Sequence, residues 1–159
     1  MVRMMFVCAV VCVNCCMAYT YTNVTELVGN PLSPTEISRL PTRDSSTPDT
    51  VFLGTIRSLL QGDLTGLYYH FETNYLFEVT GFHALGQIPE ALQASFRSVM
   101  VDGCFSNLTI SAYSAVPTNQ AVKISALIRE NFSARIVNES LNLVVSKFGT
   151  RWEIISYEE

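Results

Sequence analysis

This chain has 159 residues, a formal net charge of −4, 48% hydrophobic residues and 15% charged residues. A length of this order fits one domain with a short extra segment. The sparse charges and plentiful aromatic residues exclude a disordered chain. The mildly acidic balance, without a Lys/Arg cluster, argues against binding to nucleic acid or to anionic membrane surfaces.

Residues 1–18 have the pattern of a secretory signal peptide. Arg3 precedes the apolar run Met4–Val13, and Cys16-Met17-Ala18 ends the stretch on a small residue. The apolar run is roughly ten residues long, whereas a membrane span needs about twenty. We therefore expect cleavage after Ala18, a secreted protein, and no membrane association once the signal is removed.

Most of the cysteines belong to this predicted signal, namely Cys8, Cys12, Cys15 and Cys16. Only Cys104 remains in the mature chain, so an intrachain disulfide framework is excluded. Cys104 is then either a buried thiol that packs as a small apolar residue or one half of an intermolecular bridge.

Four N-x-S/T sequons follow the predicted signal, at Asn23, Asn107, Asn131 and Asn138. Behind a signal peptide, this number in one small domain favours N-glycosylation in a eukaryotic secretory pathway. Ordinary polar surface in a bacterial export product is the alternative. In its predicted strand, Asn138 lies on the face opposite to the apolar residues, and Asn131 lies near a predicted turn. Both positions therefore suit an exposed glycan.

Residues 19–47 are expected to form a flexible N-terminal segment. They contain Pro31, Pro34 and Pro41, many Ser/Thr residues and no sustained apolar period. The folded unit is expected over residues 48–159. It begins at Thr47-Pro48-Asp49, where Thr47 suits the N-cap, Pro48 the first helical position and Asp49 the positive end of the helix.

The first half of this unit has a helical pattern. Apolar residues at helical spacing predict a helix of about fourteen residues that ends at Gly62. Asp63 caps a second, shorter helix through Phe71, and Ile88 to Met100 define a third. Between the last two, we expect a strand over Tyr75–Thr80, with Gly81 as its stop.

From Asn107 onward, apolar residues recur at every second position. Alternating apolar residues predict strands near 107–110, 122–129, 137–145 and 152–157, separated by turns at Pro117–Gln120 and Gly149-Thr150. Helices followed by antiparallel strands indicate an α+β fold, with helices on one face of a single sheet.

The order and spacing of several short motifs resemble the nuclear transport factor 2-like superfamily. The resemblance covers about residues 48–158. It is carried by Leu60-Gln61-Gly62-Asp63-Leu64, Phe71, Phe77-Glu78-Val79, Gly86-Gln87 and the closing Gly149-Thr150-Arg151-Trp152-Glu153-Ile154-Ile155. The resemblance implies a cone, in which three N-terminal helices pack on a strongly curved antiparallel sheet and leave a cavity at the wide end. Because this superfamily hosts enzymes, transport factors and oligomerisation modules, the fold does not decide the function.

The ketosteroid-isomerase branch of the superfamily needs a carboxylate base in the first strand and a Tyr donor on the first helix. The matching positions here are Val79 and about Thr55, so that chemistry is not supported. A dehydratase-type site would use a pocket His with an Asp and a Tyr; the candidates are His83 and Asp102, with two surface polar residues as the alternative. No residues have metal-ligand spacing, so no metal or cofactor is expected.

Three functions stay open. The first is a non-catalytic module whose cavity binds a small apolar ligand or a protein, with Tyr68 and Tyr69 as candidate lining residues, although core or rim positions are the alternative for both. The second is a structural or oligomerising domain, and the third is an isomerase- or dehydratase-type enzyme. A pocket carboxylate with a raised pKa would favour the enzyme, and a large open apolar pocket would favour the binder. The last strand has apolar residues at both of its alternating sets of positions, Trp152 with Ile154 and Ile155 with Tyr157. One set would therefore be exposed on the outer face of the sheet. Together with the analogy to the superfamily, this predicts a homodimer through that face.

Overall fold

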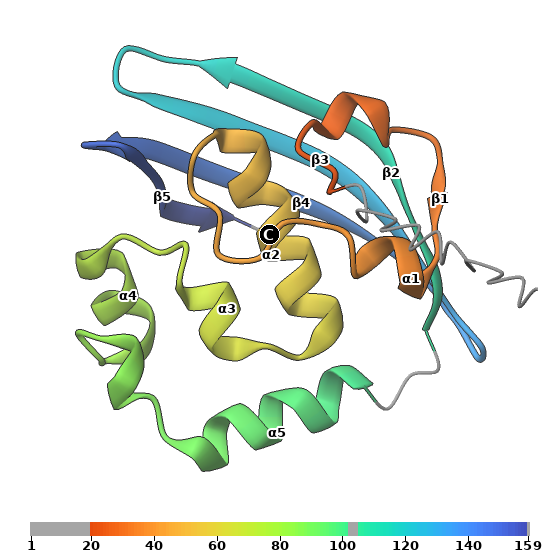
Figure 1. The fold of residues 1–159 in the computed structure, drawn as a ribbon, viewed down its shortest axis with the longest axis horizontal. Coiled ribbons are helices and arrows are strands. Elements are labelled where there is room, and N and C mark those ends of the chain that lie inside the picture. Colours follow the sequence, from red (N-terminus) through yellow and green to blue (C-terminus); the bar gives the residue numbers. More distant parts are fainter. Residues whose placement is uncertain (1–19, 102–104, 159) are drawn as a thin grey trace, which may run out of the picture.

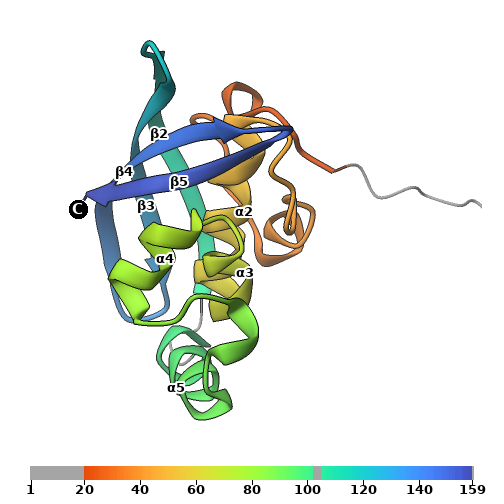
Figure 2. The same cartoon turned by 90° about the vertical axis from the view of Figure 1, so that its left-hand side faces the viewer.

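The computed structural model describes residues 20–101 and 105–158. Within them, helices and one five-stranded antiparallel sheet share a hydrophobic core, which confirms the α+β class (Figure 1). The predicted signal peptide, Asp102 and Cys104 lie outside the described residues. The long strands of the sheet are bent, and the helices lie on its concave side (Figure 2).

The sheet is a meander in the order β1-β2-β3-β4-β5, with each strand antiparallel to its neighbours. The predicted period-two segments are confirmed as strands. Ile128 lies opposite Ile110, and Leu143 lies opposite Ile124, so buried side chains face one another on the concave side. The strands are β1 Pro31–Leu32, β2 Phe105–Pro117, β3 Ala121–Phe132, β4 Ile136–Phe148 and β5 Arg151–Glu158.

The predicted first helix is α2, Pro48–Gln61. The Thr47 hydroxyl accepts a hydrogen bond from the backbone N–H of Thr50, and Pro48 occupies the first turn, as the sequence predicts. Gly62 ends the helix with a φ of 64°. A side chain at Gly62 would also lie 2.7 Å from Cα of Arg97, so this glycine lets the helix α5, Glu90–Val101, approach closely.

The segment before Thr47 packs into the core, contrary to the expected flexible lead-in. It forms η1 Val24–Glu26, β1 and α1 Pro34–Ile37, and the Gly29 N–H donates to the Ile110 carbonyl over 2.8 Å. Five of its apolar side chains are at most 3% exposed: Val24, Leu27, Leu32, Ile37 and Leu40. Their irregular spacing, imposed by turns, gives no helical or strand period, which is why the periodicity of the sequence does not predict the packing.

Asp49 ties this segment to the sheet. One carboxylate oxygen accepts the Val24 N–H over 3.0 Å, and the other accepts the Tyr113 hydroxyl of β2 over 2.6 Å. Burial and the hydrogen bond to Asp49 together raise the pKa of Tyr113, so its hydroxyl keeps its proton and remains a donor.

The strand predicted over Tyr75–Thr80 is wrong, because this segment is the helix α4, Thr73–Thr80. The Glu72 carboxylate accepts the N–H groups of Asn74 and Tyr75, and Gly81 closes the last turn with a φ of 76°. These two caps stabilise a helix that its strand-forming residues do not favour.

The remaining helices are α3 Leu64–Tyr68, capped by Asp63, and α5 Glu90–Val101, which follows η2 Leu85–Gln87. The predicted second and third helices correspond to α3 and α5, whereas α1 and α4 are additional. Of the described side chains of α5, residues 90–99, none is buried. In Figure 2, α5 lies well away from the sheet, at the opposite end of the molecule from the β2–β3 turn.

An irregularity in the pairing of β4 with β5 changes which side chains of β5 face the core. Between Val144 and Val145 the pairing with β5 shifts by one residue, so Tyr157 pairs with the buried Leu143 and Ile154 with the buried Val145. Tyr157 therefore turns to the concave side with Ile154, not to the outer face with Ile155. This removes part of the reason for expecting an apolar outer face.

Candidate functional site

A small cavity lies between the C-terminal half of α2 and the concave face of the sheet. Its volume is about 20 Å³, enough for one water molecule. Most of its lining is aliphatic. The lining residues are Ile56, Leu59 and Leu60 from α2, Leu108, Ile128 and Leu141 from the sheet, and the polar Glu130, Glu139, Ser140 and Tyr157.

Two carboxyl groups enter this lining from neighbouring strands. Ile128 of β3 pairs with Glu139 of β4, and Glu130 lies two residues further along the same face of β3. Burial, and then the Glu139 carboxylate, raises the pKa of Glu130, against a smaller opposing effect of Arg135. Because no Lys or Arg is among the lining residues, the pocket is apolar with a negative end.

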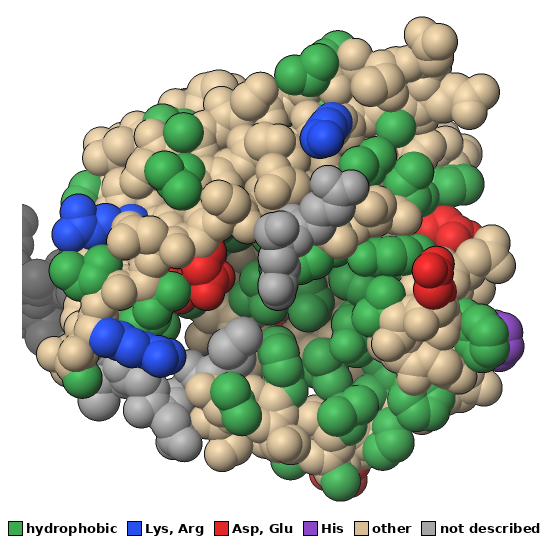
Figure 3. Space-filling view, turned by 180° about the vertical axis from the view of Figure 1, so that it is seen from behind, with side chains coloured by type: hydrophobic (Ala, Val, Ile, Leu, Met, Phe, Trp, Pro, Cys, Tyr) green, Lys and Arg blue, Asp and Glu red, His purple; other side chains and the backbone are tan. Residues whose placement is uncertain are grey.

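The surface beside the sheet is hollowed and lined by hydrophobic side chains (Figure 3). Comparison with Figure 1 places the hollow between the sheet and α5. Two apolar residues of α5 are open to solvent, since Leu92 is 44% and Val99 is 74% exposed. Phe96 of the same helix packs against the smaller cluster of Leu64, Leu67 and Ile88, so the apolar face of α5 is only partly covered by the described chain.

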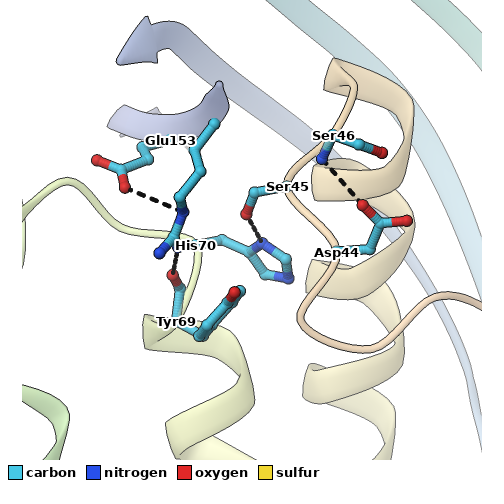
Figure 4. Close-up of polar contacts among 7 residues, drawn as sticks. Asp44, Ser45, Ser46, Tyr69, His70 and Glu153 are labelled. Atoms are coloured by element: carbon cyan, nitrogen blue, oxygen red, sulfur yellow. Dashed lines mark hydrogen bonds and ion pairs between the residues drawn. The ribbon is translucent and has the colours of Figure 1, made fainter. Parts of the chain in front are cut away.

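His70 is the second notable polar group, and it is fully buried beside α2 (Figure 4). Its Nδ1 lies 3.3 Å from the Ser45 hydroxyl, and its Nε2 has no hydrogen-bond partner within the described chain. An added Cβ at Gly54 would lie 2.5 Å from Nε2, so the glycine on α2 makes room for the ring. Burial, and then the charge of Arg151, lowers the pKa of His70 to about 4.

Ser45 and His70 have the residue types of a nucleophile and its base, but their burial gives them a structural role. Ser45 is 6% exposed and His70 is 0% exposed, which leaves no surface for a substrate. The backbone around them holds three segments together, because the Ser45 carbonyl accepts the Trp152 N–H and the His70 carbonyl accepts the Ile154 N–H.

Arg151 covers this junction from outside. Its guanidinium lies 4.6 Å from the centre of the Tyr69 ring, donates to the Tyr69 carbonyl and pairs with Glu153 over 3.5 Å (Figure 4). Tyr69 also lies beside Arg43. Tyr68 packs edge-on against Phe71, in a smaller cluster with Leu64 and Leu67. The candidate ligand residues Tyr68 and Tyr69 are therefore near aromatic and cationic neighbours, and neither lines the cavity described above.

Of the two candidate catalytic residues, only His83 lies in the described structure, and it does not line this cavity. His83 is exposed, and its ring stacks on Phe77 with centroids 4.0 Å apart. Asp102 lies outside the described residues. In the part of the chain that the structure describes, no group of three His, Cys, Asp or Glu side chains is placed to hold a metal ion.

The structure places the predicted glycosylation residues at three different kinds of position. Asn23 is exposed and caps η1 through its side-chain oxygen. Asn138 is exposed and lies opposite Arg129. Asn107 and Asn131 lie directly opposite each other on β2 and β3, and their side chains are hydrogen-bonded.

Sequence reasoning missed Glu130, Glu139 and His70. The signal for the first two was available, because Glu130 continues the buried parity of Ile128 and Glu139 shares the parity of Leu141. The alternation alone, however, does not show that a carboxyl group at its end lines a pocket. His70 gave no signal, since its burial depends on Gly54 and on a segment expected to be flexible.

No helix in residues 20–101 and 105–158 is both long and apolar enough to span a membrane. No protein-family model matches the chain, and no curated protein is significantly similar to it. A similar solved structure is that of a SEC-C motif containing protein from Rhodopseudomonas palustris. The likeness covers 77% of this chain and 84% of that one, at 11% identity and a TM-score of 0.48. A likeness of this degree carries no argument about fold family or function.

Proposed function

We propose that this chain is an exported, non-catalytic domain that binds a small molecule with an apolar body and a cationic head. The observation that carries the proposal is the aliphatic pocket with Glu130 and Glu139 at one end and no basic lining residue. An apolar site with a few convergent polar groups is the usual form of a ligand pocket.

The size of the pocket constrains the ligand. A space of about 20 Å³ admits only a small polar head. The apolar body of the ligand would then lie in the open hollow seen in Figure 3. A protonated amine suits the head, because a cation beside Glu130 offsets both the burial and the repulsion from Glu139 that raise the pKa of this residue.

Three ligands with the same alkyl chain test this proposal. Calorimetric titration with octylammonium, octanol and octanoate should give affinities in that order, with at least about a tenfold difference between the first and the last. The variant Glu130→Gln should lose most of this preference. The control Glu78→Gln changes an exposed residue of α4 and should keep it. Equal affinities of the wild-type protein for the three ligands would refute a cation-selective pocket.

Export is part of the same proposal, supported by the pattern of residues 1–18. Secreted material should begin near Tyr19 on N-terminal sequencing. Material that begins at Met1 would overturn this part.

For the fold family we propose the cone of the nuclear transport factor 2-like superfamily. It is supported by the Gly62-Asp63 turn between two helices, the bent antiparallel sheet and the position of the pocket. The helix α4 departs from it, because the resemblance expects the first strand there. An experimental structure of the complex with octylammonium would test both the cone and the position of the ligand.

A homodimer through the outer sheet face remains a prediction. Leu127 and Ile155 are 45% and 37% exposed, which supports it. Light scattering at micromolar concentration checks it, and a concentration-independent monomer mass would exclude the dimer.

An isomerase- or dehydratase-type enzyme is the second candidate, and the raised pKa of Glu130 favours it. In that case Glu130 would transfer protons to or from a ligand in the pocket. Deuterium uptake from D₂O into a bound short-chain ketone, abolished in Glu130→Gln, would support the enzyme. Binding without exchange would favour the module that only binds.

A further inference from the structure

Two of the four sequons compete for one place on the outer face of the sheet. Asn107 of β2 and Asn131 of β3 are direct partners in the antiparallel register. Their neighbours Leu108 and Glu130 face the concave side, so the two asparagines point outward. Side chains directly opposite each other have Cβ atoms about 4.5–5.5 Å apart. Two bulky glycans cannot both occupy that space.

The hydrogen bond between the two amides distinguishes them. Nδ2 of Asn131 donates to Oδ1 of Asn107. Nδ2 of Asn107, the atom that a glycan would modify, has no hydrogen bond to any residue that the structure describes. A sugar on Asn107 therefore leaves the bond intact, whereas a sugar on Asn131 replaces a hydrogen of the nitrogen that donates it.

The space around the two strands gives an independent reason for the same choice. Asn131 lies between two neighbours, with Asn107 on one side and Ile136 of β4 on the other. On the far side of β2, the described pairing with β1 involves only Thr109 and Leu108. On the β1 side, Asn107 itself has no strand partner among the described residues, so it is paired on one side where Asn131 is paired on both.

We propose that Asn107 carries an N-linked glycan and that Asn131 remains unmodified and supports it through its amide. The inference rests on the proposed export of the chain. In the transfer, Nδ2 of Asn107 attacks the anomeric carbon of an oligosaccharide carried on a lipid pyrophosphate. A C–N bond replaces the C–O bond, the pyrophosphate leaves with the bonding electrons, and Nδ2 loses one proton.

Glycopeptide mapping of the full chain tests this directly. The protein is expressed with its own signal in a eukaryotic secretory cell line, and the secreted fraction is deglycosylated enzymatically in H₂¹⁸O, which marks each former glycan site as a labelled aspartate. Trypsin separates the two sites, because Lys123 and Arg129 lie between them. We expect label at Asn107 and none at Asn131. Label at both sites, at Asn131 alone or at neither would overturn the inference.

Two variants that keep both asparagines provide matched controls. Thr109→Ala removes the sequon of Asn107, and Ser133→Ala removes the sequon of Asn131. The first should lower the mass of the secreted protein by one glycan, and the second should leave it unchanged. The reverse result would contradict the assignment.

Expression of the same chain behind a heterologous signal peptide separates this inference from the export proposal. If the chain is secreted only behind the heterologous signal and Asn107 is labelled, the export proposal fails and the glycan assignment stands. If the chain is secreted with its own signal but Asn107 lacks label, export stands and the assignment fails.

Discussion

The helices α2 and α5 have similar amphipathic sequences but very different surroundings. In α2, the apolar face and several small polar residues are buried against the sheet, including Phe52 and Leu53 at 0% exposure. In α5, no described side chain is buried, and Val99 is 74% exposed. An amphipathic period therefore shows that a helix has an apolar face, but not that the rest of the chain covers it.

The two helices divide the molecule into a closed part and an open part. The closed part is formed by the N-terminal segment, α2, the sheet and the buried His70. The open part contains the hollow of Figure 3 and the pocket carboxyl groups. We expect stability to depend mainly on the closed part, and any ligand to enter from the open part.

Deletion of residues 20–46 should have the largest effect on stability, because it removes the N-terminal segment from the closed part. The deletion removes five buried apolar side chains, each of which stabilises the fold by about 1.5–3 kcal/mol as an upper estimate. It also removes β1, which pairs with β2. We expect the truncated chain to lose its cooperative thermal transition in circular dichroism. A melting temperature within a few degrees of the full-length value would mean that the segment is only loosely attached.

A matched pair of leucine substitutions compares the two helices directly. Leu53→Ala on α2 should lower the free energy of unfolding by about 4 kcal/mol, because the side chain is fully buried. Leu92→Ala on α5, where the side chain is 44% exposed, should cost about 1 kcal/mol or less. Urea denaturation measures both values, and equal losses would mean that α5 is as well packed as α2.

Acid should weaken the closed part through His70. Its pKa in the folded protein is about 4, below the ordinary value of 6.5 for a histidine, so the unfolded chain binds the proton more readily. The stability contribution is complete above pH 6.5 and is lost as the pH falls towards 4, by about 3 kcal/mol in total. Arg151 and Arg43 oppose protonation of the ring, and Asp44 favours it.

This contribution is checked by measuring the free energy of unfolding between pH 4 and pH 7 for the wild type and for His70→Gln, whose side chain cannot titrate. The two curves should converge as the pH falls. The control His83→Gln changes an exposed ring and should run parallel to the wild type. Parallel curves for His70→Gln would show that His70 does not cause the acid sensitivity.

Gly54→Ala tests the contact between α2 and His70. The added Cβ would lie 2.5 Å from Nε2, so the ring or the helix must shift, at about 2 kcal/mol. Gly86→Ala is the matched control, because nothing lies within 4 Å of its added Cβ and its φ needs no glycine. It should change stability by no more than about 0.5 kcal/mol. A neutral Gly54→Ala would indicate that the junction is less tightly packed than the distances suggest.

Elements whose signals are local could be predicted from the amino-acid sequence. The Thr47-Pro48 cap and Gly62 define α2, and the alternation around Ile124 and Leu143 defines the long strands, because caps and periods are set by neighbouring residues. The same local rules failed over Tyr75–Thr80, where strand-forming residues are held in a helix by Glu72 and Gly81.

Which of these surfaces are covered depends on the packing of the whole chain. The burial of Leu32 and Leu40, the enclosure of His70 against Gly54 and the meeting of Glu130 with Glu139 all join residues that are distant in sequence or lie on different strands. Burial and electrostatic coupling depend on what lies opposite a side chain in space. A local pattern can show that a side chain is apolar or charged, but its neighbours in the fold decide whether it becomes core, pocket or surface.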